Sequence, residues 1–490
     1  MLKHSLLLGT LFCSLSLFAQ SPATFRLHLS QEPINLDPNK QNSSSASYLL
    51  GNLYRNLLRY DNDAGLVPEL AEKCQREKTG DLTCTLKKNL KWSDGSPLTS
   101  ADFLRTYKKI LKPENKAPRA DLLFPIKNAQ AIYEGKLSDD KLGITTPTPL
   151  TLKFSFESST PEFEYHLSSL VLSPTKENLQ VYNGPYVLKD WSRGKKIILE
   201  NNKFYVTDGL NRPLVEFLFI EEDSVALQLY EKQNLDFLRR LPTLYIPKFK
   251  SRPDFVWSPM IRFDYFGFGP ELKDREDVRK ALTYSLNYPE WQKLFSSEGR
   301  PGCAGLPDKW FPKAAPCFDF DLKKIPAITS DKTWTVMFSS LGGDDHKRAT
   351  EWMQSQWMQN ARIKTHIVLK ENKIYLQELR KNPPAIFRKG VTPDRPTCLA
   401  ALETFSSQNP ENYIQLKSPE FEKILLKLSS SAKIQDKKKF CLEGVQYLMN
   451  RHLLIPTGAI HFSILANEKF IGWKLNEMNE LDLSGLRSKP

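Results

Sequence analysis

The chain has 490 residues, a formal net charge of +13 and an isoelectric point of about 9.1. Its 40% hydrophobic and 26% charged residues are typical of globular proteins and exclude a chain that is disordered, collagenous or coiled-coil throughout. At roughly 100–200 residues per domain, the length predicts about three domains, one of them split by an insertion. The basic charge admits a nucleic acid, an acidic membrane surface or an anionic ligand as partner and does not choose among them.

The N-terminus is predicted to be a signal peptide over residues 1–19. Lys3 supplies a short positive region, and the apolar stretch 6–18 is too short to span a bilayer comfortably. A lipoprotein signal needs a small residue before its cysteine, and Phe12 before Cys13 is not small. We therefore expect a soluble periplasmic protein with a cleaved signal peptide, and not a lipoprotein.

Strands and helices are predicted to alternate along the rest of the chain. Alternating apolar residues or short apolar runs indicate strands at 24–30, 82–92, 150–156, 185–202 (a hairpin), 214–220, 334–340 and 363–370. Apolar residues at helical spacing indicate helices at 45–58, 102–111, 276–295, 346–360, 418–430 and 437–452. Thr99-Ser100-Ala101-Asp102 is a capping box that opens the second of these helices. The pattern is that of an α/β or α+β protein whose lobes are built from discontinuous segments.

The cysteines that follow the signal peptide number six, which permits three disulfides in an oxidising compartment, in any of fifteen pairings. Two of them flank a predicted hairpin turn at 78–81, and two more bracket a proline-rich loop, which leaves the last two for each other. The favoured pairs are Cys74–Cys84, Cys303–Cys317 and Cys398–Cys441. Their spacing does not match a zinc site.

Motifs for catalysis are missing from the sequence. It contains no GxSxG, HExxH, Walker A or helix-opening GxGxxG sequence. The tightest polar cluster, Asp344-Asp345-His346, is typical of a loop that caps a helix and not of a metal site. Basic runs such as 437–439 are typical of solvated helix faces, and no basic and aromatic residues interleave as in a nucleic-acid platform. We therefore expect no enzyme activity, cofactor, metal or nucleic-acid partner.

Several segments, taken in order, resemble one family over nearly the whole chain. They are QEPINLDP (31–38), LVPELAEKCQREKTGDLTCTLKKNLKWSDGSPLTSADF (66–103), NGPYVLKDWSRGKKIILENNKFY (183–205), NLDF (234–237), REDVRKALTYSLN (275–287) and SPEFEKIL (418–425). Each is weakly specific alone, but together they resemble the extracytoplasmic solute-binding proteins of ABC transporters, family 5, which bind oligopeptides, dipeptides or nickel.

This resemblance implies an α/β fold of the two-lobed periplasmic binding protein type (type II, with an extra inserted domain), with mixed sheets and a hinge between the lobes. The implied first lobe combines one domain, built from 20–45, 178–262 and 455–490, with an inserted domain at 46–177. The implied second lobe is 263–454. The lobes of such a monomer close on an oligopeptide or related small solute, and the closed form docks on a membrane permease.

The resemblance also suggests ligand-binding residues. Peptide-binding members use backbone groups of the loop after L-D-P, which corresponds to Asn42, Ser43 and Ser44. They pair the peptide's amino group with an aspartate of a W-x-A-D-Y-x-x-P segment. In the matching stretch, 389–396, Lys389 replaces the tryptophan and Thr392 replaces the aspartate, which argues against the standard capture of a peptide amino group. Asp394, two positions further on, is the candidate to replace that carboxylate.

A basic cleft is the second hypothesis for the ligand. Arg239 and Arg240 follow NLDF, where the family often has cleft residues, and Arg388, Lys389 and Arg395 are expected to face them. Such a cleft suits a carboxylate or phosphate, whereas the alternative is a rim of surface charge. Two other functions stay open: a ligand sensor or scaffold with the same fold, and a secreted enzyme with an unrecognised site.

Overall fold

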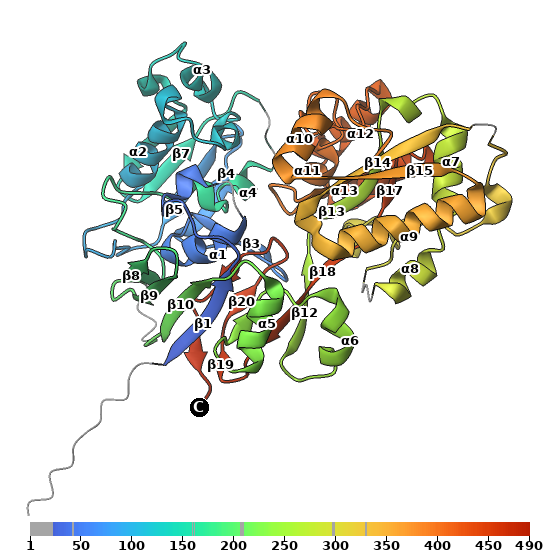
Figure 1. Ribbon diagram of the computed structural model, residues 1–490. Helices are drawn as coiled ribbons and strands as arrows, with labels where there is room; N and C mark the ends of the chain where they lie inside the picture. Colours follow the sequence, from blue (N-terminus) through green and yellow to red (C-terminus); the bar gives the residue numbers. More distant parts are fainter. Residues whose placement is uncertain are drawn as a thin grey trace, which may run out of the picture.

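A computed structural model describes residues 23–41, 44–158, 160, 162–205, 210–295, 299–328 and 331–490. The predicted signal peptide, Asn42 and Ser43 lie outside these residues, and so does the side chain of Ser44. Figure 1 shows two lobes side by side, the first blue to green with the red C-terminus and the second yellow to orange. This is the two-lobed α/β architecture expected from the sequence, with several mixed sheets.

A seven-stranded sheet forms the base of the first lobe. Its order is β12 (Phe255–Met260), β18 (Ile460–Ala466), β11 (Phe237–Leu238), β1 (Thr24–Leu29), β10 (Leu214–Phe219), β9 (Lys196–Asn201) and β8 (Tyr186–Ser192). β1 runs parallel to both β10 and β11, so these strands end at the same edge of the sheet. Helices α1 (Ser44–Leu53), α5 (Asp223–Glu231) and α6 (Ile246–Phe249) belong to this part of the chain.

A smaller four-stranded sheet carries the inserted part of the first lobe, called the four-stranded domain below. Its order is β4 (Ala71–Arg76), β5 (Leu82–Leu86), β7 (Thr151–Phe154) and β6 (Ile144–Thr148), with helices α2 (Ser100–Leu111), α3 (Ala129–Tyr133) and α4 (Phe163–His166) and a hairpin of β2 (Leu58–Asp61) and β3 (Gly65–Pro68). Trp92 is fully buried in its core. The expected capping box is present, because the Thr99 N–H donates to the Asp102 carboxylate at 2.8 Å.

A five-stranded sheet is the centre of the second lobe. Its order is β15 (Lys364–Lys370), β14 (Thr333–Ser339), β16 (Ile386–Val391), β13 (Phe263–Phe268) and β17 (Leu454–Pro456). β14 and β15 are parallel and joined by α9 (Gly343–Ala361), which confirms the predicted strand-helix-strand unit. The other helices are α7 (Glu276–Tyr284), α8 (Tyr288–Leu294), α10 (Asn372–Lys381), α11 (Cys398–Glu403), α12 (Pro419–Ser430) and α13 (Ile434–Asn450).

Two predicted helices were too long. The helix expected at 276–295 is divided into α7 and α8, because Pro289 has no N–H for the ladder and Asn287 caps a new helix by accepting from the Glu290 N–H at 3.2 Å. The helix expected at 45–58 ends at Leu53, and residues from Leu58 pair in a hairpin instead.

Disulfides join the three favoured cysteine pairs. Cys74 and Cys84 face each other on β4 and β5, Cys303 and Cys317 close a loop of the second lobe, and Cys398–Cys441 ties α11 to α13. Short strands in the C-terminal segment pair as β19 (Phe470–Ile471) with β22 (Arg487–Ser488) and as β20 (Lys474–Leu475) with β21 (Leu481–Asp482).

The chain crosses between the lobes twice, once from β12 to β13 and once from β17 to β18. β12 pairs antiparallel with β18 and β13 pairs antiparallel with β17, so both crossings run together as one two-stranded ribbon. Within the described ranges, no helix is long and apolar enough to cross a membrane. No group of three His, Cys, Asp or Glu side chains in this part of the chain is arranged to hold a metal ion.

Candidate functional site

The edge at which β11 ends is the candidate ligand cleft. In α/β sheets, ligands bind beyond the carboxyl ends of the strands. The chain that leaves β11 reaches across to the second lobe, where the Thr243 hydroxyl hydrogen-bonds the Asp345 carboxylate in α9. The side chains that follow β11 therefore meet those at the start of α9.

An arginine pair around one buried carboxylate forms the wall on the second lobe. Asp264 of β13 is 3% exposed and forms ion pairs with Arg262 at 2.5 Å and with Arg388 at 2.7 Å. Asp264 lies opposite Gly390 in β16, so Arg388, two residues away, is on the same face. A Cβ on Gly390 would lie 2.1 Å from the Asp264 Oδ1 atom, so the glycine leaves the space that this ion-pair cluster occupies.

The charges of this wall determine the protonation of its acid and its histidine. Burial alone would raise the pKa of Asp264, but the charges of Arg262 and Arg388 outweigh it and hold the pKa below its usual range. Burial, and then the charge of Arg388, lowers the pKa of His346 to about 2, so the imidazole is neutral at physiological pH. The charge of Arg240, from the first lobe, also lowers this pKa.

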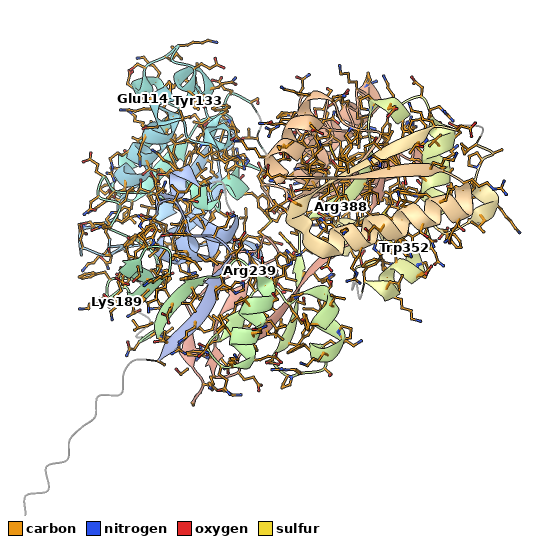
Figure 2. The ribbon with its side chains drawn as sticks, viewed as in Figure 1. Glu114, Tyr133, Lys189, Arg239, Trp352 and Arg388 are labelled. Atoms are coloured by element: carbon orange, nitrogen blue, oxygen red, sulfur yellow. A yellow bond between two sulfur atoms is a disulfide. The ribbon has the colours of Figure 1, made fainter. Side chains whose placement is uncertain are left out.

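The first lobe contributes Arg239 and Arg240. Arg240 lies 3.7 Å from the Asp223 carboxylate. Arg239 is half-buried, its guanidinium lies 5.6 Å from the centre of the Tyr48 ring, and it has no ion pair with any residue that the structure describes. Figure 2 labels Arg239 on the first lobe and Arg388 on the second, on either side of the region where the lobes meet. The arrangement provides positive charge from both lobes, which favours an anionic group between them.

Lys389 and Thr392 do not lie with these arginines. Successive residues of a strand point to opposite faces, so Lys389 leaves the face of Arg388 and lies over the Tyr413 ring at 5.4 Å, with Glu411 at 3.9 Å. Thr392 is exposed to solvent. The expectation that Lys389 faces Arg239 is therefore wrong, because strand alternation turns it away.

Asp394 and Arg395 are engaged by charged groups of the protein itself. Asp394 pairs with Arg119 of the four-stranded domain at 3.0 Å and with Arg395 at 3.2 Å. Burial would raise the pKa of Asp394, but the charges led by Arg395 hold it below its usual range. Arg395 in turn pairs with Glu162 at 3.1 Å. A carboxylate already held by two guanidinium groups is a poor partner for a ligand ammonium group.

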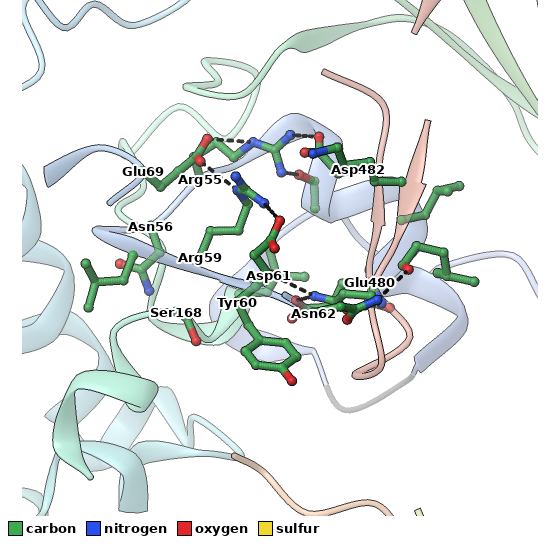
Figure 3. Close-up of a pocket in the computed structure, with 18 of the residues that line it drawn as sticks. Arg55, Asn56, Arg59, Tyr60, Asp61, Asn62, Glu69, Ser168, Glu480 and Asp482 are labelled. Atoms are coloured by element: carbon green, nitrogen blue, oxygen red, sulfur yellow. Dashed lines mark hydrogen bonds and ion pairs between the residues drawn. The ribbon is translucent and has the colours of Figure 1, made fainter. Parts of the chain in front are cut away.

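A separate cavity of about 360 Å³ lies within the first lobe, between α1, β2 and the C-terminal segment (Figure 3). Arg55 crosses it to pair with Asp482 at 2.5 Å and with Glu69 at 3.3 Å, and Arg59 pairs with Glu69 at 3.1 Å. The two arginines of this cavity are thus held by carboxylates of the protein itself, in an ion-pair network that joins distant segments of the chain.

Comparisons with known proteins agree with this architecture. The family model for the middle part of bacterial extracellular solute-binding proteins, family 5, matches residues 65–413. The chain belongs to this family. A relative in Bacillus subtilis, the oligopeptide-binding protein OppA, is 25% identical over 446 residues, covering 83% of this chain and 82% of that one. The periplasmic murein peptide-binding protein MppA of Escherichia coli is 23% identical, covering 88% and 86%.

Other similarities concern the fold and the range of family 5 ligands. The structure of Escherichia coli MppA matches with a TM-score of 0.77 at 20% identity, over 96% of this chain and 99% of that one. Haemophilus influenzae OppA in complex with RPPGFSPFR matches with the same score, identity and coverage. Escherichia coli YgiS, 25% identical over 88% of this chain and 87% of its own, is named as a probable deoxycholate-binding periplasmic protein. The names of family 5 proteins thus cover more than one kind of ligand.

Sequence reasoning missed the buried carboxylate at the centre of this candidate cleft. Arg262 directly precedes β13, Asp264 lies in β13 and His346 lies in α9, and no motif brings them together. The available signal was Arg262-Phe263-Asp264, which places an ionisable pair at the start of an otherwise apolar segment, since buried charges need partners.

Proposed function

We propose that this protein is the extracytoplasmic solute-binding component of an ABC importer. It captures an oligopeptide or a related small solute between its lobes and delivers it to a membrane permease. Membership of family 5 supports this proposal, as do relatives named as oligopeptide-, dipeptide- and murein peptide-binding proteins. The protein acts without catalysis or a cofactor, as a monomer in the periplasm, after removal of residues 1–19 and without a lipid anchor.

The proposed lobes follow the predicted segments. The first lobe combines 20–45, 178–262 and 455–490 with the inserted domain 46–177, and the second is 263–454. The paired crossing strands β12–β18 and β13–β17 form the hinge on which the lobes close. Asn42, Ser43 and Ser44, next to the start of α1, supply backbone hydrogen bonds to the ligand.

The proposed ligand carries an anionic group, which binds between Arg239 and the arginine pair on Asp264. The observation that supports this most strongly is Arg239, a half-buried guanidinium without an ion pair in the described part of the chain. Charged hydrogen bonds of arginine to a carboxylate or phosphate are stronger than neutral ones and fix the orientation of the ligand. Because Asp394 is already paired, a free ammonium group on the ligand is not required.

Two measurements test the proposal. Mass spectrometry of protein purified gently from the periplasm identifies a retained solute, expected to be a peptide or a related anion. Thermal shifts with Ala-Glu-Ala, Ala-Ala-Ala, Ala-Lys-Ala and N-acetyl-Ala-Glu-Ala are expected to be largest for the two acidic peptides, with or without the acetyl group. Larger shifts with the neutral or basic peptide contradict the anionic site, and no retained solute together with no shift contradicts the binding function.

A further inference from the structure

The four-stranded domain and the second lobe are joined by a group of charged side chains away from the arginine cleft. Its centre is Arg395, in the segment between β16 and α11, whose side chain is only 10% exposed. The Arg395 guanidinium donates to the Glu162 carboxylate at 3.1 Å and to His166 Nε2 at 3.2 Å, and both partners lie in or directly before α4. The Thr397 hydroxyl donates to the same Glu162 oxygen at 2.9 Å.

A second ion pair runs in the opposite sense beside the first. Arg119 belongs to the four-stranded domain and Asp394 to the second lobe, and their side chains lie 3.0 Å apart. Each side thus gives one cation and one anion to the other: Arg119 and Glu162 from the first lobe, Arg395 and Asp394 from the second. Four contacting groups in this alternating arrangement attract across the junction, and the removal of any one of them leaves a group of opposite charge without one of its partners.

The histidine takes part as a neutral acceptor. His166 Nδ1 lies 2.9 Å from the Leu122 carbonyl oxygen, which accepts only, so Nδ1 carries the proton. The lone pair of Nε2 then faces the Arg395 guanidinium, which also pairs with Glu403 and Asp394 of its own lobe.

The second-lobe side of this group rests on a rigid support. Thr397 is the N-cap of α11 and accepts from the Ala400 N–H at 3.2 Å. The next residue, Cys398, is bonded to Cys441 of α13, so the segment that carries Arg395 is fixed to the helices of the second lobe. Glu162 is fixed in turn, because Phe163 directly after it is buried in the core of the four-stranded domain.

We propose that Arg119, Glu162, Asp394 and Arg395 form an ion-pair clasp that holds the two lobes together when no ligand is bound. The clasp goes beyond the proposed function, because it needs no solute. A population of closed protein then exists before the ligand arrives, and less of the ligand's binding energy is used to bring the lobes together. Smaller interlobe contacts support it elsewhere, such as that of Lys309 with Glu477 at 2.7 Å.

The test measures lobe separation in ligand-free protein, prepared by unfolding, dialysis and refolding. Small-angle scattering is expected to give wild type a compact radius of gyration, roughly 23 Å for a chain of this length, and to give Arg395→Met a value about 1 Å larger. Spin labels are attached at the exposed residues Ser138 and Gln408, each replaced by cysteine, one on each side of the junction. In Arg395→Met, the distance between the two labels is expected to show a second, longer population.

The matched control is Arg76→Met. Arg76 pairs with Glu164 of the same helix α4, at 2.7 Å, but inside the four-stranded domain, so its loss should leave the lobe distance unchanged. Thr397→Val removes the hydroxyl that donates to Glu162 and caps α11, and it serves if Arg395→Met does not fold. A smaller but measurable longer-distance population is expected. The proposal is overturned if ligand-free wild type shows the same distances as Arg395→Met and Thr397→Val. Because no solute is present, this result does not depend on whether the binding function is correct.

Discussion

Replacing Arg239 by glutamine tests the assignment of the anionic site most directly. Arg239 has no ion pair in the described chain, and its guanidinium lies 5.6 Å from the centre of the Tyr48 ring. Its contribution to the stability of the folded protein is therefore limited to about 0.5–1 kcal/mol of cation–π interaction. A hydrogen bond to a charged group contributes about 1.5–3 kcal/mol, which corresponds to a roughly 10- to 150-fold change in affinity. We expect Arg239→Gln to weaken binding of an acidic peptide by that factor while the protein stays folded.

Calorimetric titration with N-acetyl-Ala-Glu-Ala, or with the solute that mass spectrometry identifies, measures this loss. Arg193→Gln is the matched control, since Arg193 also lies over an aromatic ring, at 3.5 Å from the centre of Trp191, but is 65% exposed at the far turn between β8 and β9. Both variants lose one positive charge, so the comparison at one salt concentration cancels the effect of net charge. The affinity of Arg193→Gln for the peptide should equal that of wild type. An Arg239→Gln affinity within the error of the Arg193→Gln value would refute the assignment.

Three further results are expected. Replacing Cys398 and Cys441 by alanine should cost about 4 kcal/mol of unfolding free energy, from the entropy of a loop spanning 43 residues, and urea unfolding that shows no loss would contradict this. Burial, then the charge of Arg395, lowers the pKa of His166 to about 4 from the usual 6.5, so the unfolded chain binds the extra proton and stability falls as pH drops from 6.5 to 4. That change is worth about 3 kcal/mol, and His166→Asn should show a shallower loss of melting temperature between pH 7 and 4.5; equal slopes would count against a buried neutral imidazole. Gly390→Ala should lower stability by about 1–3 kcal/mol through contact with the Asp264 ion pairs, and unchanged melting and acidic-peptide affinity would argue against that packing.

Local signals predicted most of the elements. The strand-helix-strand unit around α9, the hairpin of β8 and β9 and the capped helix α2 all rest on short-range periodicity and caps, which act within a few residues. The division of α7 from α8 depends on Pro289. The apolar spacing continues through this residue, so periodicity alone predicts one helix, although a proline disfavours helix at the residue before it. The pairing of β1 with β10 and β11 joins segments about two hundred residues apart, and the sequence pattern alone does not specify such partners.

The site was less predictable for the same reason. Arg239 and Arg240 were proposed from their place after NLDF, and Asp394 and Arg395 from their place in the 389–396 stretch. Their ion-pair partners could not be predicted, because a charged residue in a sequence does not indicate which distant carboxylate it will contact. Glu162, for example, lies 233 residues before Arg395. Lys389 was misplaced since its orientation depends on the strand register of β16, which a residue count alone does not give.

The two-stranded crossing also has a consequence for how the molecule is put together. Tyr265 of β13 lies directly opposite Pro456 of β17, and paired strands are about 4.8 Å apart. The second lobe therefore begins and ends at neighbouring points, so a short linker would close the first lobe after its removal, and the excised lobe is one continuous chain. In engineering terms, the second lobe is a continuous cassette that can be excised or exchanged through a single pair of neighbouring junctions.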